Sequence, residues 1–348
     1  RVGQVDQGEA DMIEEAMTVI THWLHRYALS GKAGKDMQES AQADADMNLY
    51  TGEGDGTLEE ELAERPGAEL LCVGRNAIAA DPDDNESIFA IDERHLDAMS
   101  ASHHMRGFLC VPGVAFVWLG VTAAIDFAMM MVEKVMAGNT RLDMLAAGSF
   151  AVVLFSGGAW LFWRYFVSFD WFHYRANPIR FDRERRMVHV WRSSRVGGPF
   201  SVPWDDSLYL MRGQRDGDNG EGARIFPTTF LSVDPATRRI KRRFVVGKTI
   251  TNQAKSDAFI AYIQRYMAEG PQAVPTPKRW AKMTPSLAYS FNTYFNITGA
   301  LELQRKGTLG LGHLIFMAVL SPLLVLLSLA HFVAILTGRE PKWPVEMS

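Results

Sequence analysis

Three long runs of apolar residues dominate the sequence. The first covers residues 107–132 and carries one charged side chain, Asp126. The second covers residues 144–169 and is uncharged until its last turns, and the third covers residues 309–336 and contains no Asp, Glu, Lys or Arg. A helix needs about 20 apolar residues to cross the hydrocarbon core of a bilayer. Because buried helices of soluble proteins are usually shorter and carry a polar face, the pattern predicts three transmembrane helices.

The runs divide the chain into a two-helix transmembrane hairpin, residues 107–169, and a third transmembrane helix with a short tail, residues 307–348. Three spans put residues 1–106 and 170–308 on one side of the membrane and the tail from residue 338 on the other. Basic residues near the span ends mark the cytoplasmic side. Most of them lie within residues 170–308, close to the second and third spans: Arg175, Arg180, Arg183, Arg185, Arg186, Arg305 and Lys306. We therefore expect both large polar regions in the cytoplasm and the tail in the periplasm.

Between the second and third runs, the apolar positions change to the alternation of β-strands. Strands are predicted at residues 178–181, 187–191, 200–204, 208–211, 225–233 and 240–246. Residues 252–267 follow with one apolar helical stripe, which ends before Gly270. A small sheet needs a cover for its apolar face. We therefore predict a pleckstrin-homology-like antiparallel barrel or sheet capped by one helix over residues 170–275, and an α+β membrane protein as the fold class.

The N-terminal part of the chain differs in charge from the rest. Residues 1–100 hold 7 Lys and Arg against 23 Asp and Glu, whereas residues 101–348 hold 29 basic and 17 acidic residues. Helical spacing over residues 10–29 and beyond residue 57 predicts an acidic, mostly helical region, 1–106, with a loop at 30–57. Opposite charges in one compartment predict weak, salt-sensitive association of this region with the basic domain.

A segment rich in aromatic residues, 276–306, precedes the third run. Its aromatic side chains are Trp280, Tyr289, Phe291, Tyr294 and Phe295. Pro285 favours a helix start, and most of the aromatic residues after it fall on one face of that helix. This pattern predicts an interfacial helix at the level of the lipid headgroups. Packing of the same face against the barrel domain is the alternative.

The sequence lacks the motifs of common enzyme classes. It contains no phosphate-binding loop, no nucleophile elbow and no C-x-x-C pair, and its two cysteines, Cys72 and Cys110, cannot form a disulfide framework. His103 and His104 are adjacent rather than at the i, i+4 spacing of helical metal ligands. The acidic run at 216–222 lacks the ligand pattern of an EF-hand. We therefore expect a protein that binds rather than catalyses, without metal or cofactor.

Three stretches of the chain carry a resemblance to a known group of proteins. They are NPIRFDRERRMVHVWR, VPWDD and AYIQRYMAEGPQAVP, at residues 177–192, 202–206 and 261–275. They resemble an uncharacterised family of proteobacterial membrane proteins over about residues 105–340. Members have paired spans, a strand-rich cytoplasmic domain and a further span near the C-terminus, and are often encoded beside type VI secretion effectors, including pore-forming ones. The resemblance implies a multi-pass inner-membrane protein that gives immunity to such an effector.

Two features within the spans are candidates for specific contacts. Asp126 is the one acidic residue deep in a span, where a charge needs a partner or water. At 1.5 Å per residue, Asp126 and His331 lie at similar depth if the first and third spans run in the same direction, which predicts a hydrogen bond between them. Hydration of Asp126, or its pairing with Lys134, is the alternative. Small residues in the second span allow close helix packing: Ser156, Gly157, Gly158 and Ala159.

The strongest cluster of positive charge lies around the last predicted strand. It consists of Arg238, Arg239, Lys241, Arg242, Arg243 and Lys248. Anionic lipid headgroups and the acidic N-terminal region are the expected partners, and a solvated strand face is the alternative. Nucleic acid is not expected, because the domain is tethered at the membrane and has no recognition motif.

Together these patterns predict a binding protein of the bacterial inner membrane. Its partners would be the lipid bilayer and a cognate toxin, which the spans would hold in a non-conducting state. The alternative is a membrane-anchored scaffold or regulator whose cytoplasmic domain docks a soluble partner or anionic lipid.

Overall fold

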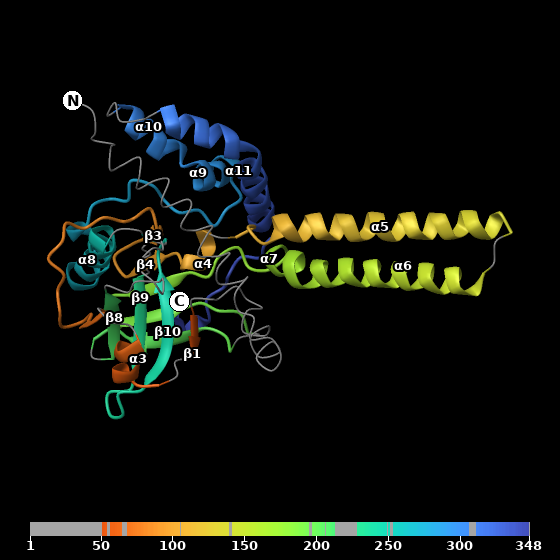
Figure 1. The fold of residues 1–348 in the computed structure, drawn as a ribbon. Coiled ribbons are helices and arrows are strands. Elements are labelled where there is room, and N and C mark those ends of the chain that lie inside the picture. Colours follow the sequence, from red (N-terminus) through yellow and green to blue (C-terminus); the bar gives the residue numbers. More distant parts are fainter. Residues whose placement is uncertain are drawn as a thin grey trace.

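The computed structural model describes residues 51–347 apart from 54–55, 65–67, 105, 139–140, 195–196, 206, 213–227, 249, 251–252 and 306–310. A domain built from two antiparallel sheets carries a long helical hairpin that projects away from it (Figure 1). The predictions for residues 1–50 and for the run at 216–222 lie outside the described residues.

The two sheets have five strands each, with every pair antiparallel. The first has the order β1-β10-β9-β8-β2, formed by Thr51–Glu53, Ile240–Val246, Thr228–Val233, Leu208–Arg212 and Glu69–Cys72. The second has the order β3-β4-β5-β6-β7, formed by Ile88–Ile91, His95–Ala98, Ile179–Asp182, Met187–Val190 and Phe200–Pro203. Neither sheet closes into a barrel among the described strands. The structure thus confirms the α+β class and the antiparallel strands, with two open sheets where one capped barrel or sheet is predicted.

Residues of both sheets and of one helix form the core of the domain. Phe181 in the second sheet meets Phe230 in the first, with ring centroids 6.4 Å apart, and Phe244 stacks on Phe230 at 5.5 Å. Helix α8, Gln253–Glu269, contributes its buried apolar stripe to this core. The six strands predicted between residues 178 and 246 and the helix after them are confirmed as β5–β10 and α8. Inward-facing residues of these strands, such as Val188, Val202 and Leu210, belong to this core, and β9 is buried at all of its positions.

The acidic N-terminal region is part of the domain rather than a separate helical unit. Among the described residues between 51 and 104, the helical segments are α3, Leu58–Glu64, and the single turn α4, Ala101–His104, whereas β1–β4 are strands in the two sheets. Helix α3 begins at Thr57 with a capping box, in which the Thr57 N–H donates to Glu60 Oε2 at 2.7 Å and the Glu60 N–H donates to Thr57 Oγ1 at 3.3 Å. The prediction of a mostly helical region is therefore wrong for its described part.

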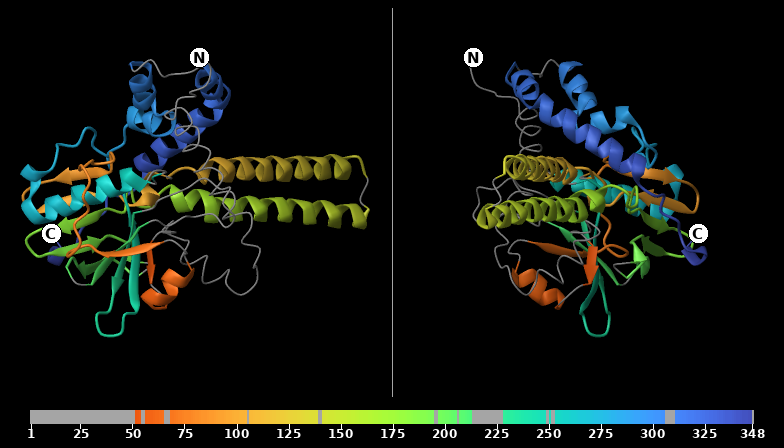
Figure 2. Two further views of the ribbon diagram at one scale, coloured as in Figure 1. Left: turned by 60° about the vertical axis from the view of Figure 1, so that its left-hand side comes forward. Right: turned by 90° about the vertical axis from the view of Figure 1, so that its right-hand side faces the viewer.

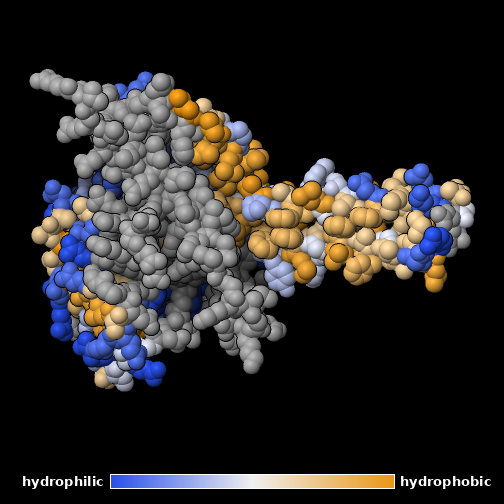
Figure 3. Space-filling view, viewed as in Figure 1, coloured by the Kyte–Doolittle hydropathy of each residue, from blue (hydrophilic) through white to orange (hydrophobic). Residues whose placement is uncertain are grey.

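Two long helices form the projecting hairpin. Helix α5 is Cys110–Met136, and α6 is Leu142–Phe162, which continues through a π-helical turn, Trp163–Val167, and the short α7, Ser168–Asp170. The two helices lie side by side in all three ribbon views (Figures 1 and 2). Their outer surface is mostly apolar (Figure 3), with Trp118 and Val153 each 70% exposed.

Helix α11, Leu311–Thr337, is the third helix long and apolar enough to cross a membrane, and three such helices suggest membrane association. It does not run alongside the hairpin as expected for a third parallel span. Figures 1 and 2 show that it crosses obliquely at the base of the hairpin. Helix α9, Leu287–Phe295, packs along it, and α10, Ile297–Arg305, connects the two.

The C-terminal tail returns to the two-sheet domain. The Arg339 N–H donates to the His173 carbonyl at 2.6 Å, and the Arg175 N–H donates to the Arg339 carbonyl at 2.8 Å. Further along, Trp191 Nε1 donates to the Lys342 carbonyl at 3.1 Å. The tail therefore packs against the domain, a contact that the prediction of a periplasmic tail does not anticipate.

Candidate functional site

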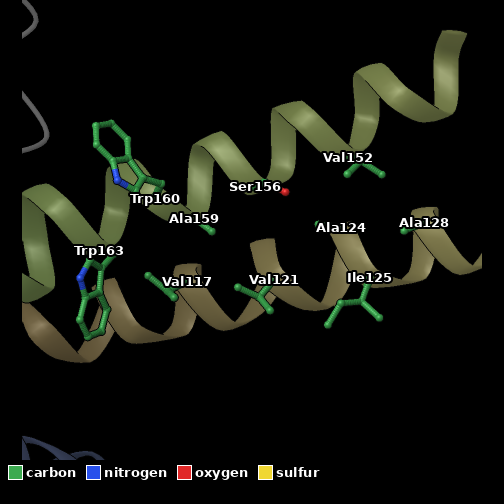
Figure 4. A pocket seen from close by; sticks show the side chains of 10 residues that line it. All are labelled: Val117, Val121, Ala124, Ile125, Ala128, Val152, Ser156, Ala159, Trp160 and Trp163. Carbon is green, nitrogen blue, oxygen red and sulfur yellow. The ribbon is translucent and has the colours of Figure 1, made fainter.

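An apolar groove runs between the two helices of the hairpin (Figure 4). It has a volume of about 490 Å³ and is open along one side of the hairpin. Its lining residues are Val117, Val121, Ala124, Ile125, Ala128, Val152, Ser156, Ala159, Trp160 and Trp163. All come from α5, α6 and the π-helical turn that follows α6. Figure 4 shows Trp160 and Trp163 at the end of the groove that is nearer the domain, and Val152 and Ala128 at the other. We call this feature the hairpin groove.

Glycines bring α5 and α6 into close contact beside the hairpin groove. A Cβ atom on Gly120 would lie 2.9 Å from the Cβ of Ala159, and one on Gly113 would lie 2.9 Å from the Cβ of Phe166. Of the predicted packing residues, Ala159 is at this contact, whereas Gly157 and Gly158 face open space and Ser156 is an exposed residue of the groove lining. The close approach therefore depends on Gly113 and Gly120 of α5, which are not among the predicted packing residues.

Replacing Gly120 with leucine is expected to separate the two helices and to lower the free energy of unfolding by about 1–3 kcal/mol, because the larger side chain has no room against Ala159. Denaturant unfolding of the full chain in a mild detergent measures the change. Gly157→Leu is the matched control, since a Cβ there meets no atom within 4 Å. It should be neutral or stabilise the helix by up to about 1 kcal/mol. Equal losses in both variants would contradict the assigned packing.

The predicted pair of Asp126 and His331 is not formed. His331 lies at the base of the hairpin, where a Cβ atom on Gly107 would collide with the backbone of Ala330 and His331. Asp126 is an exposed residue of α5, 16 residues beyond its first residue Cys110, which corresponds to about 24 Å along the helix. The prediction assumed parallel spans, and the oblique course of α11 removes that premise.

His331 belongs instead to a buried cluster that we call the polar junction, made of His103, Arg106, Asp170, Ser290 and His331. His331 Nδ1 and Ser290 Oγ are 2.8 Å apart, and the rings of His331 and His103 are 6.1 Å apart. All five residues are buried. They come from α4 and the segment after it, α7, α9 and α11, so the polar junction joins the hairpin, α9 and α11 to the domain.

Asp170 is the acidic member of the polar junction. Its carboxylate accepts a hydrogen bond from the backbone N–H of Gly107, and its Oδ2 lies 3.8 Å from the Sγ of Cys110. Burial raises the pKa of Asp170 to about 6, although the nearby Arg106 guanidinium and the Gly107 N–H act in the opposite direction. Burial also holds the pKa of His103 well below its usual value, with further lowering by His331 and Arg106. The sequence signal for Asp170 was a lone acidic residue directly after the second apolar run.

The aromatic residues predicted at a membrane interface are divided between two environments. Tyr294 contacts the polar junction, since its hydroxyl donates to the Arg106 carbonyl at 3.1 Å and its ring centroid is 5.9 Å from that of His331. Tyr289 also faces His331, at 6.0 Å between ring centroids. Phe291 and Phe295 stack on each other at 5.7 Å, while Trp280 precedes α9 and is 40% exposed. Helix α9 therefore packs its tyrosines inward, mainly against α11.

The predicted cluster of positive charge is largely matched by carboxylates of the same chain. Arg238 pairs with Glu59 at 2.7 Å, Lys241 with Asp234 at 3.0 Å and Lys248 with Glu86 at 2.6 Å. Arg243 pairs with Glu61, and Arg242 lies over the ring of Phe200 at 5.3 Å. Arg239 forms an isolated β-bridge with Thr57.

Most of these carboxylates belong to the acidic region, which the structure thus brings to the basic domain as expected. It does so through strands of a common sheet as well as ion pairs, so the described contact is part of the fold rather than a weak association. The charge available to lipid headgroups is correspondingly smaller. Among the described residues, no group of three or more His, Cys, Asp or Glu side chains is arranged to hold a metal ion.

Comparison with known proteins gives one match. The sequence model of a family of unknown function (DUF6708) matches residues 159–348, which is more than half of the chain. The match begins within α6 and covers β5–β10 and α8–α11. No curated protein and no solved structure matches the chain.

Proposed function

Since the chain belongs to this family of unknown function, we propose from its structure that it is a membrane-anchored binding protein whose hairpin groove receives an apolar helix of a second protein. The observation that carries the proposal is the groove itself. It lies between two helices of membrane-spanning length whose most apolar stretches are only 6% and 11% buried. Helices in lipid associate through close packing of small residues, and Ala124, Ala128 and Ser156 supply such residues in the groove.

The dimensions of the groove fit one side of a transmembrane helix. On α5 it extends from Val117 to Ala128, which is about 16 Å of helix and roughly half of a hydrocarbon core. Its lining is almost entirely apolar, with the Ser156 hydroxyl and the indole nitrogens as its polar side-chain groups. Such a lining offers little to a polar ligand and favours contact with aliphatic side chains.

The proposed location is the bacterial inner membrane, with the two-sheet domain in the cytoplasm. Length and composition of α5 and α6 support insertion. The residues after the hairpin carry Arg175, Arg180 and Arg183, whereas the connection at its tip offers Lys134 and Arg141. This excess of basic residues beside the domain favours the cytoplasm for it.

The proposed biological role is immunity to a pore-forming effector of a type VI secretion system. The sequence resemblance of residues 177–192, 202–206 and 261–275 supports this role, because such proteins are often encoded beside these effectors. Neutralisation requires binding alone: a helix of the inserted effector held in the hairpin groove could not join a conducting pore. No catalytic step is part of the proposal.

Filling the groove should abolish protection without removing the protein from the membrane. Cells that lack the gene are complemented with the wild type, with Ser156→Phe, which fills the groove, or with Val153→Phe, at a 70% exposed position outside the groove lining. The cells are mixed with sister cells that fire the effector, and survivors are counted. We expect wild-type and Val153→Phe cells to survive and Ser156→Phe cells to die like the deletion strain, at equal protein levels in the membrane fraction.

Two outcomes would overturn parts of this proposal. Full survival of the deletion strain would reject the immunity role and favour the alternative, a membrane-anchored scaffold whose cytoplasmic domain docks a soluble partner. Protection by Ser156→Phe at the wild-type level would reject the hairpin groove as the binding site while leaving the immunity role in place.

A further inference from the structure

Helix α11 has one buried side and one exposed side. The inner side is buried, mainly against α9 and the base of the hairpin, and contains Leu324, Leu327, Ser328, Ala330, His331, Ala334 and Ile335. The outer side is exposed and contains Ile315, Val319, Leu323, Leu326, Leu329 and Leu336. As a result, 39% of its most apolar stretch is buried, a far larger share than in either hairpin helix. A helix with one covered and one open apolar side differs from a span surrounded by lipid.

The C-terminal end of α11 is fixed to the base of the hairpin. The Phe172 N–H donates to Thr337 Oγ1 at 3.3 Å, and Arg175 Nε donates to the Gly338 carbonyl at 2.9 Å. Arg339 then forms a parallel β-bridge with Tyr174. The chain that leaves α11 therefore joins the segment that leaves the hairpin, on the side of the domain.

The contact between α11 and the hairpin lies at the first turn of α5. Ala330 packs with Cys110 and Val167, which are the first residue of α5 and the last residue of the π-helical turn. If the hairpin crosses a bilayer as proposed above, this contact is at the level where α5 enters it and the chain leaves it. Exposed aromatic side chains occur at the same level: Trp163, Tyr165 and Phe172 are 42%, 56% and 53% exposed. Aromatic residues of this kind mark the headgroup level of membrane proteins.

From these contacts we infer that α11 does not cross the membrane but lies in the cytoplasmic interface of the bilayer, with its outer side against lipid. The occupant of this surface is the boundary between headgroups and acyl chains, because the apolar outer side continues into the apolar surface of the hairpin (Figure 3). The chain then spans the membrane twice, and the tail, the domain and α9 share one compartment. The inference rests on the proposed insertion of the hairpin, but not on the immunity role.

Reporter fusions to the full chain test the topology. Green fluorescent protein, which fluoresces only in the cytoplasm, and alkaline phosphatase, which is active only in the periplasm, are each fused after Ser348 or inserted between Gly138 and Arg141 at the hairpin tip. We expect fluorescence and no phosphatase activity after Ser348, and the reverse at the tip. Phosphatase activity after Ser348 would show a third span and overturn the inference. Cytoplasmic reporters at both sites would overturn the proposed insertion of the hairpin together with it.

A depth measurement tests the lipid contact itself. A fluorophore is attached to Leu323→Cys on the outer side of α11, or to Lys255→Cys at an exposed position of α8, in a chain with Cys72→Ser and Cys110→Ala. The protein is placed in phosphatidylethanolamine and phosphatidylglycerol vesicles whose lipids carry a nitroxide near the headgroup or near the chain end. We expect the label at position 323 to be quenched most by the shallow nitroxide and the label at position 255 to be quenched by neither. Stronger quenching of position 323 by the deep nitroxide, or no quenching of it by either, would contradict an interfacial helix.

Discussion

Replacing Arg180 with alanine is expected to release the C-terminal tail and to lower the free energy of unfolding by about 3–5 kcal/mol. Its guanidinium donates to both carboxylate oxygens of Asp97, at 2.7 and 2.9 Å, and to the Met347 carbonyl at 3.2 Å. It also lies over the ring of Trp343, 4.9 Å from the centroid. Alanine would leave the buried Asp97 without its cation and remove two contacts of the tail. Denaturant unfolding measures the stability, and trypsin cleavage at Arg339 and Lys342 measures the release of the tail.

Two further variants separate the two effects of this arginine. Trp343→Ala removes the stacking on Arg180 but leaves the ion pair with Asp97, so it should accelerate tail cleavage with a smaller loss of stability, up to about 2 kcal/mol. Arg180→Lys keeps the charge and loses the bidentate geometry, so it should fall between wild type and alanine in stability. Unchanged cleavage of the tail in Arg180→Ala would contradict its docking on β5 and β6.

The parts of the fold that were predictable from sequence are those in which one local pattern decides the structure. The three apolar runs exceed the length of ordinary buried helices, and all three form long helices. Strands β5–β10 are short stretches with apolar residues separated by turn residues, so their positions follow from the residues of each strand alone. Phe181 and Phe230, for example, belong to two of these stretches and meet in the core.

The strands of the acidic region were missed because their pairing is not local. Strand β2 has the sequence Glu69-Leu-Leu-Cys, without alternation, and it pairs with β8 more than 130 residues later. Strand β4 pairs with β5, which follows it only after the entire hairpin, and its Asp97 is opposite Arg180. Four-residue strands of this kind are stabilised by the neighbours they join rather than by their own propensity.

The orientation of the helices likewise could not be predicted from hydropathy. Hydrophobic runs give the length of α11 but not its direction, which depends on α9, on the return of the tail and on the polar junction. The same holds for the packing faces within the hairpin, because both helices carry apolar residues on all sides. The spacing of apolar residues therefore does not distinguish Gly120, which contacts Ala159, from Gly157, which faces open space. The depth comparison that paired Asp126 with His331 failed for this reason.

Replacing Asp170 with asparagine is expected to stabilise the protein at neutral pH and to change how its stability depends on pH. The pKa of this carboxyl is about 6 in the folded chain and 3.8 as its ordinary value. The folded state therefore binds a proton that the unfolded state has lost, and the stability contributed by Asp170 falls as the pH rises from about 4 to about 6. Asparagine carries no such proton and can still accept the hydrogen bond of the Gly107 N–H. The stability difference between variant and wild type should grow by roughly 3 kcal/mol across this interval and stay constant above it.

The difference in stability between Asp170→Asn and the wild type is the quantity to compare, because His103 changes the stability of both proteins with pH in the opposite direction to Asp170. Its pKa is lowered in the folded chain, so its contribution to stability is present above about pH 6.5 and is lost as the pH falls below that value. The two contributions partly cancel in the wild type, and subtraction removes that of His103. Asp143→Asn, at an exposed carboxylate of the hairpin tip, is the control and should change stability at neutral pH by less than about 0.5 kcal/mol. If the difference between Asp170→Asn and wild type did not change with pH, this carboxyl would be ionised in the folded protein throughout the interval, and the buried polar junction would have to be open to water.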